Sequence, residues 1–206
     1  MFRTLLLIIL FLSSGSVTAE NKTILILADS LSDSYGISIE QGWVSLLQQR
    51  LVKQEYNYKI LNASISGDTT HSARNRLGRI LEDDLPDITI IELGGNDGLR
   101  GLQTTEIKDN LAGIIDILIT QGSEVLLIPM LLPPNYGQVY IDKFSEIYIQ
   151  LAKTEDVTLG RFILDGIAEN PELMQRDGIH PTAEAQQLML NNIWPELEML
   201  LGKNQS

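Results

Sequence analysis

The chain has 206 residues, a length that fits one domain. It carries 15 Lys and Arg residues against 27 Asp and Glu residues, and its formal charge is −12. An acidic surface repels nucleic acid and anionic lipid headgroups, so we expect no nucleic-acid partner. The sequence contains no cysteine, which excludes disulfides, cysteine nucleophiles and thiolate metal sites.

The first 19 residues predict a cleavable secretion signal. Arg3 is their only charge, Leu5–Leu12 is an unbroken apolar run, and small and polar residues lead to Val17-Thr18-Ala19. The run is shorter than the roughly 20 residues of a spanning helix, and an uncleaved membrane anchor is the alternative. We expect a periplasmic or secreted domain over residues 20–206, with no lipid-anchoring cysteine and no stable membrane insertion. The loss of Arg3 changes the formal charge from −12 to −13.

In chain order, short apolar runs alternate with amphipathic helical stretches. Strands are predicted at Thr23–Ala28, Tyr58–Asn62, Ile88–Leu93, Glu124–Pro129 and Arg161–Leu164, and helices at about 40–54, 69–82, 104–120, 140–153 and 182–201. This alternation is typical of an α/β domain with a parallel sheet covered by helices on both faces. Ligands bind beyond the carboxyl ends of the strands in such sheets, so residues that directly follow the strands are candidates for function.

A serine follows the first predicted strand, in the block Ala28-Asp29-Ser30-Leu31-Ser32. The Ser30 hydroxyl can attack a carbonyl carbon, and its backbone N–H can face the oxyanion that forms. Taken alone, the block is more typical of a turn or helix cap. Ser32 and Ser34 are competing nucleophiles by residue type, and Ser30 is preferred because it lies nearest the strand end.

Glycine-containing blocks follow the second and third predicted strands. Gly67 lies in Ser66-Gly67-Asp68-Thr69, where glycine permits a positive φ and lets the N–H reach an oxyanion; an ordinary strand-to-helix turn is the alternative. Asn96 lies in Gly94-Gly95-Asn96-Asp97-Gly98, which lacks the pattern of a phosphate-binding loop. An Asn side chain on a glycine-flanked turn suits an oxyanion donor, and a tight turn stabilised by Asn is the alternative.

The late block Asp177-Gly178-Ile179-His180-Pro181 is the most specific indication of a catalytic site. Asp177 can hold one ring nitrogen of His180 and leave the other facing a nucleophile; a His that caps the last helix is the alternative. The second histidine, His71, lies in a polar helical segment and is predicted to be a surface residue. With two distant histidines and no cysteine, the sequence disfavours a metal site, and no cofactor is expected.

These four blocks resemble those of the SGNH (GDSL) hydrolase superfamily, which is named for a Ser, a Gly, an Asn and a His in separate blocks. The resemblance covers essentially the whole chain after residue 19 and includes Leu132-Pro133-Pro134-Asn135-Tyr136-Gly137. It implies a flavodoxin-like, three-layer α/β/α fold with a five-stranded parallel sheet. The family's first block usually begins with Gly where this sequence has Ala28, and the change adds strain only if φ is positive there.

The resemblance also implies roles for the site residues. Ser30 is the expected nucleophile, His180 the general base and Asp177 the residue that orients His180. The backbone N–H groups of Ser30 and Gly67 and the side chain of Asn96 are the expected oxyanion hole. The implied substrates are acyl esters and thioesters, including aryl esters, acyl-CoA and lysophospholipids, so the enzyme is expected to be a serine esterase.

The acyl group is expected to contact apolar residues at the same edge. Leu99 and Leu102 lie in a loop similar to one that moves over the acyl chain in a related enzyme, and Leu132 and Pro133 follow the fourth strand. Two alternatives stay open: a carbohydrate O-acetyl esterase of the same superfamily and a non-catalytic flavodoxin-like binding module. We expect a monomer that binds a small-molecule acyl ester.

Overall fold

A single parallel sheet forms the centre of the molecule. The computed structural model describes residues 22–83 and 85–203, and the predicted secretion signal lies outside these ranges. Within the described residues the strand order is β2-β1-β3-β4-β5, and each neighbouring pair is parallel. The strands are β1 Lys22–Ala28, β2 Tyr58–Asn62, β3 Ile88–Glu92, β4 Glu124–Leu127 and β5 Thr158–Leu159. The predicted α/β class with a five-stranded parallel sheet is confirmed.

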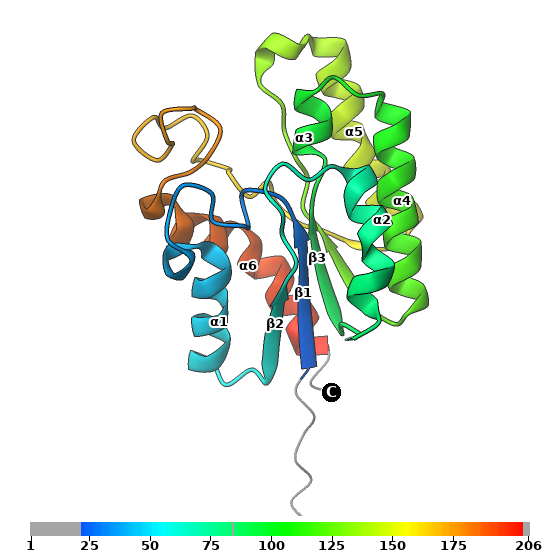
Figure 1. Cartoon of the computed structure of the whole chain (residues 1–206), viewed down its shortest axis with the longest axis vertical. Helices are drawn as coiled ribbons and strands as arrows, with labels where there is room; N and C mark the ends of the chain where they lie inside the picture. Colours follow the sequence, from blue (N-terminus) through cyan, green and yellow to red (C-terminus); the bar gives the residue numbers. More distant parts are fainter. Residues whose placement is uncertain (1–21, 84, 204–206) are drawn as a thin grey trace, which may run out of the picture.

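Helices cover both faces of the sheet (Figure 1). The first and last helices pack together on one face, and three central helices pack side by side on the other. The first layer consists of α1 Trp43–Lys53 and α6 Gln186–Lys203, and the second of α2 Thr70–Leu81, α4 Thr104–Thr120 and α5 Gln138–Thr154. The five-residue helix α3 Gly95–Leu99 lies beyond the carboxyl end of β3, and short 3-10 helices span Ile39–Gln41, Pro134–Tyr136 and Ala183–Ala185.

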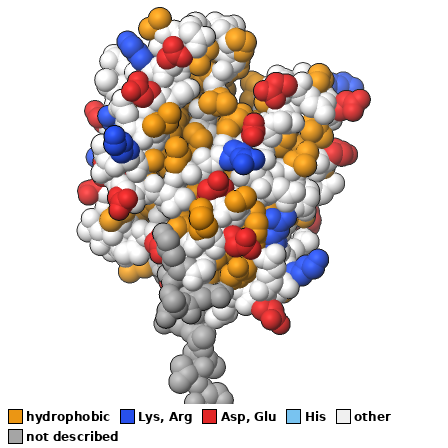
Figure 2. Space-filling model, turned by 180° about the vertical axis from the view of Figure 1, so that it is seen from behind, with side chains coloured by type: hydrophobic (Ala, Val, Ile, Leu, Met, Phe, Trp, Pro, Cys, Tyr) orange, Lys and Arg blue, Asp and Glu red, His pale blue; other side chains and the backbone are white. Residues whose placement is uncertain are grey.

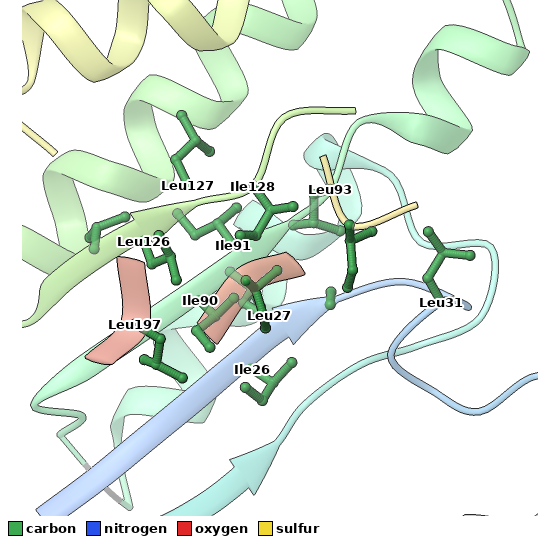
Figure 3. Packing of buried hydrophobic residues seen from close by; sticks show 14 of the residues in the cluster. Ile26, Leu27, Leu31, Ile90, Ile91, Leu93, Leu126, Leu127, Ile128 and Leu197 are labelled. Atoms are coloured by element: carbon green, nitrogen blue, oxygen red, sulfur yellow. The ribbon is translucent and has the colours of Figure 1, made fainter. Parts of the chain in front are cut away.

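The core lies between the sheet and its two helical layers. Every residue of Ile24–Ala28 on β1 and of Ile88–Glu92 on β3 is buried. Strands covered on both faces need mainly apolar side chains on both, which explains why Ile24–Ala28 is a continuous apolar run and why Ile88–Glu92 is largely apolar rather than alternating. Figure 3 shows Ile26 and Leu27 of β1 with Ile90 and Ile91 of β3 among the buried side chains, together with Leu197 from α6.

Two local predictions were wrong. Arg161–Leu164 is not a strand: the fifth strand is the shorter Thr158–Leu159, and the chain leaves the sheet after Gly160, whose N–H donates to Leu127. Ile163 and Leu164 are buried from a turn, so their apolar character reflects core packing without strand pairing. The segment Gly94–Gly98, predicted as a turn, contributes to helix α3.

The strand order directs the functional blocks to one place. From β1 the chain first adds β2 on one side and later β3 on the other, so the connections that follow β1 and β3 diverge at the carboxyl edge of the sheet. Such a switch point leaves a crevice between the diverging connections. Among the described residues, no helix has both the length and the apolar character that crossing a membrane requires.

Candidate active site

Ser30 lies on a tight turn directly after β1. The backbone N–H groups of Ser32 and Asp33 both donate to the Asp29 carbonyl, at 3.2 and 3.1 Å, so the chain turns sharply as it leaves the sheet. Ala28, in place of the family's usual Gly, is a buried strand residue and is not among the described residues with positive φ. The substitution therefore adds no backbone strain beside Ser30.

The hydroxyl, the imidazole and a carboxylate form one continuous chain of hydrogen bonds. His180 Nε2 lies 2.9 Å from Ser30 Oγ, and His180 Nδ1 lies 2.7 Å from Asp177 Oδ2. The other carboxylate oxygen, Asp177 Oδ1, accepts from the backbone N–H groups of Ile179 and His180 at 2.9 and 3.0 Å. The hydrogen bond from the His180 side chain and these two backbone donors lower the pKa of Asp177 to about 2.

The loop that carries His180 is tied to the turn that carries Ser30. The Gln175 N–H donates to the His180 carbonyl at 2.7 Å, and the Gln175 side chain donates to the Tyr35 carbonyl at 2.8 Å. The Tyr35 ring packs against the imidazole of His180, with ring centroids 4.2 Å apart and planes tilted by 32°. Neither Tyr35 nor Gln175 was predicted, because nothing in their local sequence distinguishes them from ordinary turn residues.

The expected backbone donors are the N–H groups of Ser30 and Gly67. Gly67 has a φ of +79°, and a Cβ there would meet no atom within 4 Å, so the left-handed backbone rather than crowding favours glycine. Asp33 Oδ2 accepts from the Ser66 N–H at 3.1 Å and holds this loop against the Ser30 turn. Within the part of the chain that the structure describes, the N–H groups of Ser30 and Gly67 have no hydrogen-bond acceptor.

Asn96, the expected side-chain donor, is the second residue of α3. Its Nδ2 donates one hydrogen to Asp29 Oδ2 at 2.9 Å, which leaves the second hydrogen available to a substrate. The approach to α3 requires glycine at Gly94, where φ is +105° and a Cβ would collide with the Tyr148 hydroxyl. That hydroxyl donates to the Leu93 carbonyl at 2.9 Å and packs the turn onto α5.

A buried polar cluster joins the Gly67 and Asn96 loops. Asp97 is 1% exposed, and its carboxylate accepts from the Thr70 N–H at 3.0 Å and from the Thr70 hydroxyl at 2.6 Å. Asn110 on α4 adds a longer hydrogen bond to the same hydroxyl at 3.3 Å. Arg100, at the end of α3, donates to the Gly67 carbonyl at 3.1 Å. This cluster was not predicted, because the glycine-flanked sequence around Asp97 is typical of a turn.

A cavity of about 470 Å³ opens beside Ser30 and His180. Its wall is largely apolar, and the lining includes Leu31, Leu99, Met130, Leu131, Leu132, Pro133, Pro134, Phe162, Leu164, Ala168, Met174 and Ile179. Seen from behind, the upper end of the molecule is hollowed between two lobes, with hydrophobic side chains around the hollow (Figure 2). The shape and lining suit an apolar group attached to the carbonyl that Ser30 would attack.

The four predicted groove residues have different environments. Leu99, Leu132 and Pro133 line the cavity, whereas Leu102 is not among its lining residues and packs against the core. Leu132 is 8% exposed and lies against Gly98, where a Cβ would crowd its Cδ2 at 2.6 Å. The carbonyls of Leu99 and Leu102 accept hydrogen bonds from two tyrosine hydroxyls, Tyr136 and Tyr140.

His71 lies away from these groups. It is exposed on α2, and its Nε2 lies 2.9 Å from the Asn75 side chain on the same helix. Among the described residues, no group of three or more His, Cys, Asp or Glu side chains could hold a metal ion.

Comparison with known proteins agrees with this geometry. The model of the GDSL-like lipase/acylhydrolase family matches residues 29–188, so the chain belongs to that family. It is 44% identical to Esterase TesA of Pseudomonas aeruginosa over 183 residues, which cover 89% of this chain and 91% of that protein. It is also 40% identical to an arylesterase of Vibrio mimicus over 197 residues, 96% of this chain and 98% of that protein.

Further matches are also named as thioesterases or esterases. The thioesterase 1/protease 1/lysophospholipase L1 of Escherichia coli is 39% identical over 184 residues, 89% of this chain and 87% of that protein. A crystal structure of TesA superposes with a TM-score of 0.85 and covers 87% of this chain and 99% of that one. A structure of the esterase EstA of Pseudoalteromonas, inhibited by monoethylphosphonate, also superposes with a TM-score of 0.85. It is 36% identical in sequence and covers 89% of this chain and 100% of that one. The chain is therefore an esterase that acts on small-molecule esters.

Proposed function

We propose that the enzyme hydrolyses acyl esters and thioesters through a covalent acyl-enzyme on Ser30. The observation that carries the proposal is the chain Asp177–His180–Ser30, with 2.7 and 2.9 Å between successive side chains. In this arrangement Asp177 holds the proton of His180 on Nδ1, so that the lone pair of Nε2 faces the Ser30 hydroxyl. That is the tautomer a general base needs.

The reaction proceeds in two halves. Ser30 Oγ attacks the carbonyl carbon while its proton passes to His180 Nε2, and the tetrahedral intermediate collapses when His180 returns that proton to the leaving alcohol or thiol. Water then attacks the acyl-enzyme, again giving a proton to Nε2, and the proton goes back to Ser30 Oγ as the carboxylic acid leaves. In both halves the N–H groups of Ser30 and Gly67 and the free Asn96 amide hydrogen stabilise the oxyanion.

The lining of the cavity favours an apolar acyl group over a sugar. Leu99, Leu131 and Met130 border the cavity beside the catalytic groups. Each buried methylene contributes about 0.8 kcal/mol, so kcat/KM is expected to rise from acetyl through medium-chain esters. Aryl esters, acyl-CoA and lysophospholipids are candidate substrates on the strength of the relatives' names.

A phosphonate ester is a suitable probe of the nucleophile. The purified enzyme is treated with an alkyl p-nitrophenyl phosphonate, and the labelled peptide is identified by mass spectrometry. We expect the label on Ser30 and a loss of at least about 10⁴-fold in kcat for Ser30→Ala, because triad members act as a unit. A label on Ser32 or Ser66, or equal rates on acetyl and octanoyl esters, would overturn the corresponding part of the proposal.

We also propose that residues 1–19 are removed on export and that the mature enzyme is a periplasmic or secreted monomer. The support is the order of features in this segment, in which a charged residue is followed by an apolar run and then by small and polar residues. Cell fractionation followed by N-terminal sequencing of the mature protein tests the cleavage, and light scattering tests the mass. An uncleaved protein in the membrane fraction would favour an anchor instead.

A further inference from the structure

Among the buried carboxyl groups of the described residues that the mechanism leaves unused, Glu92 is the most completely buried. This residue ends β3, directly below the active site, and is 0% exposed. Its Oε2 accepts a hydrogen bond from the Ser32 hydroxyl at 2.9 Å. Its Oε1 is also buried and has no hydrogen-bond donor among the described residues. A fully buried, ionised carboxylate with an unsatisfied oxygen would be costly, whereas a neutral carboxylic acid needs an acceptor instead.

The adjacent Asp29 supplies such an acceptor. It follows Ala28, which pairs in register with Glu92, so the two carboxyls are close enough for the charge of Asp29 to raise the pKa of Glu92. Asp29 is 3% exposed, and both of its oxygens accept: Oδ1 from the Leu31 N–H at 3.2 Å and Oδ2 from Asn96 Nδ2 at 2.9 Å. The contacts of Asp29 therefore fit an ionised carboxylate, and those of Glu92 fit a carboxylic acid.

The electrostatics of the pair agree with this assignment. Burial, partly offset by the Leu31 and Asn96 hydrogen bonds, raises the pKa of Asp29 to about 6. Burial and the neighbouring Asp29 charge raise the pKa of Glu92 well above its usual range. Two neighbouring carboxyls buried inside a protein do not both ionise near neutral pH, so one proton stays with the pair.

We propose that Glu92 and Asp29 share one proton and that this pair positions the oxyanion-binding amide of Asn96. The Glu92 acid donates to Asp29, and Asp29 in turn fixes one Asn96 hydrogen so that the other points to the substrate. A second negative charge here would oppose the developing oxyanion, and the shared proton removes it. Glu92 and Asp29 are positioning residues, and their role rests on the proposed function of Asn96.

A double-mutant cycle tests whether Glu92 acts through Asn96. Glu92→Met removes the acid with little change in length, and Glu92→Gln supplies an amide that can donate to Asp29 while accepting from Ser32. We expect Glu92→Met to lower kcat about tenfold or more with KM within about twofold, and Glu92→Gln to lose less than about threefold. In an Asn96→Ala background, Glu92→Met should lower kcat no further.

Two outcomes of the cycle would overturn the proposal. One is an equal loss of kcat in Glu92→Gln and Glu92→Met. The other is a loss of kcat on adding Glu92→Met to Asn96→Ala that is as large as the loss in the wild-type background. Infrared spectroscopy of the wild-type enzyme at pH 7 is a second test that does not require Glu92→Met to fold. The carbonyl stretch of a protonated carboxylic acid should be present in the wild-type spectrum and missing from the spectrum of Glu92→Gln. Its absence from the wild type would refute the shared proton. A phosphonate label away from Ser30 would instead refute the proposed function and leave this band unchanged.

Discussion

Replacing Asp177 with Asn tests the catalytic chain at its outer end with almost no change in side-chain size. Asp177 Oδ1 accepts two backbone hydrogen bonds, at 2.9 and 3.0 Å, so an Asn carbonyl must occupy that position; an NH₂ group there would face two donors. The Asn NH₂ then faces His180 Nδ1. That nitrogen must accept, and the imidazole proton moves to Nε2.

The substitution therefore turns the general base into a donor. Nε2 lies 2.9 Å from Ser30 Oγ, and once it carries the proton it cannot take another from the hydroxyl. The wrong tautomer costs about 10⁴-fold in kcat, which corresponds to about 5 kcal/mol in the activation barrier. The pKa of Asp177 is lowered, to about 2, so the wild-type carboxylate loses its charge only as the pH falls towards that value. Assays near neutral pH therefore compare a fully charged Asp with a neutral Asn.

The assay is the kcat for p-nitrophenyl butyrate, measured together with the melting temperature. Asp116→Asn is the matched control, because Asp116 is exposed on α4 and its replacement removes the same charge away from the site. The control should keep wild-type kcat, and both variants should keep a melting temperature close to that of the wild type. A kcat for Asp177→Asn within tenfold of the wild type would refute the tautomer argument.

Three further substitutions, two of them with a matched control, test the remaining parts of the site. His180→Ala should be nearly as damaging to kcat as loss of the nucleophile, whereas His71→Ala should be silent in the same ester assay; the reverse result would overturn the assignment of the base. Asn96→Ala should lower kcat about 10²–10³-fold with little change in KM, and steady-state kinetics showing an effect on KM alone would contradict an oxyanion role. Leu131 is 50% exposed and lines the cavity, so Leu131→Asp should flatten the rise of kcat/KM with acyl length. Val139→Asp, at a 71% exposed position outside the cavity lining, should preserve that rise, and equal behaviour of the two variants would reject the acyl-groove model.

The structure also changes which substitution is a useful probe of the groove. The sequence alone favours Leu132 as the probe, because this residue follows the fourth strand among apolar residues. Leu132 is 8% exposed and packs tightly over Gly98, so an Asp there would disturb folding as well as substrate binding. Leu131, its exposed neighbour in the chain, reports on the cavity with less effect on the core.

Much of the site could be predicted from the sequence because its signals are local. A buried strand followed by a polar turn is a short-range pattern, and the carboxyl ends of parallel strands meet at one edge in any fold of this type. Ser30, Gly67 and Asn96 could be expected to converge for that reason. The spacing of Asp177 and His180 likewise allows a hydrogen bond within one turn, independent of the rest of the chain.

Other features depend on contacts between distant segments, which local patterns do not encode. The apolar residues Ile163 and Leu164 look like a strand but are buried from a turn, because burial alone does not distinguish the two. Tyr35 meets His180 across 145 positions of the chain through loop packing. Only the pairing of β1 with β3 brings the carboxyls of Asp29 and Glu92 together, and the shared burial that follows from it raises the pKa of both.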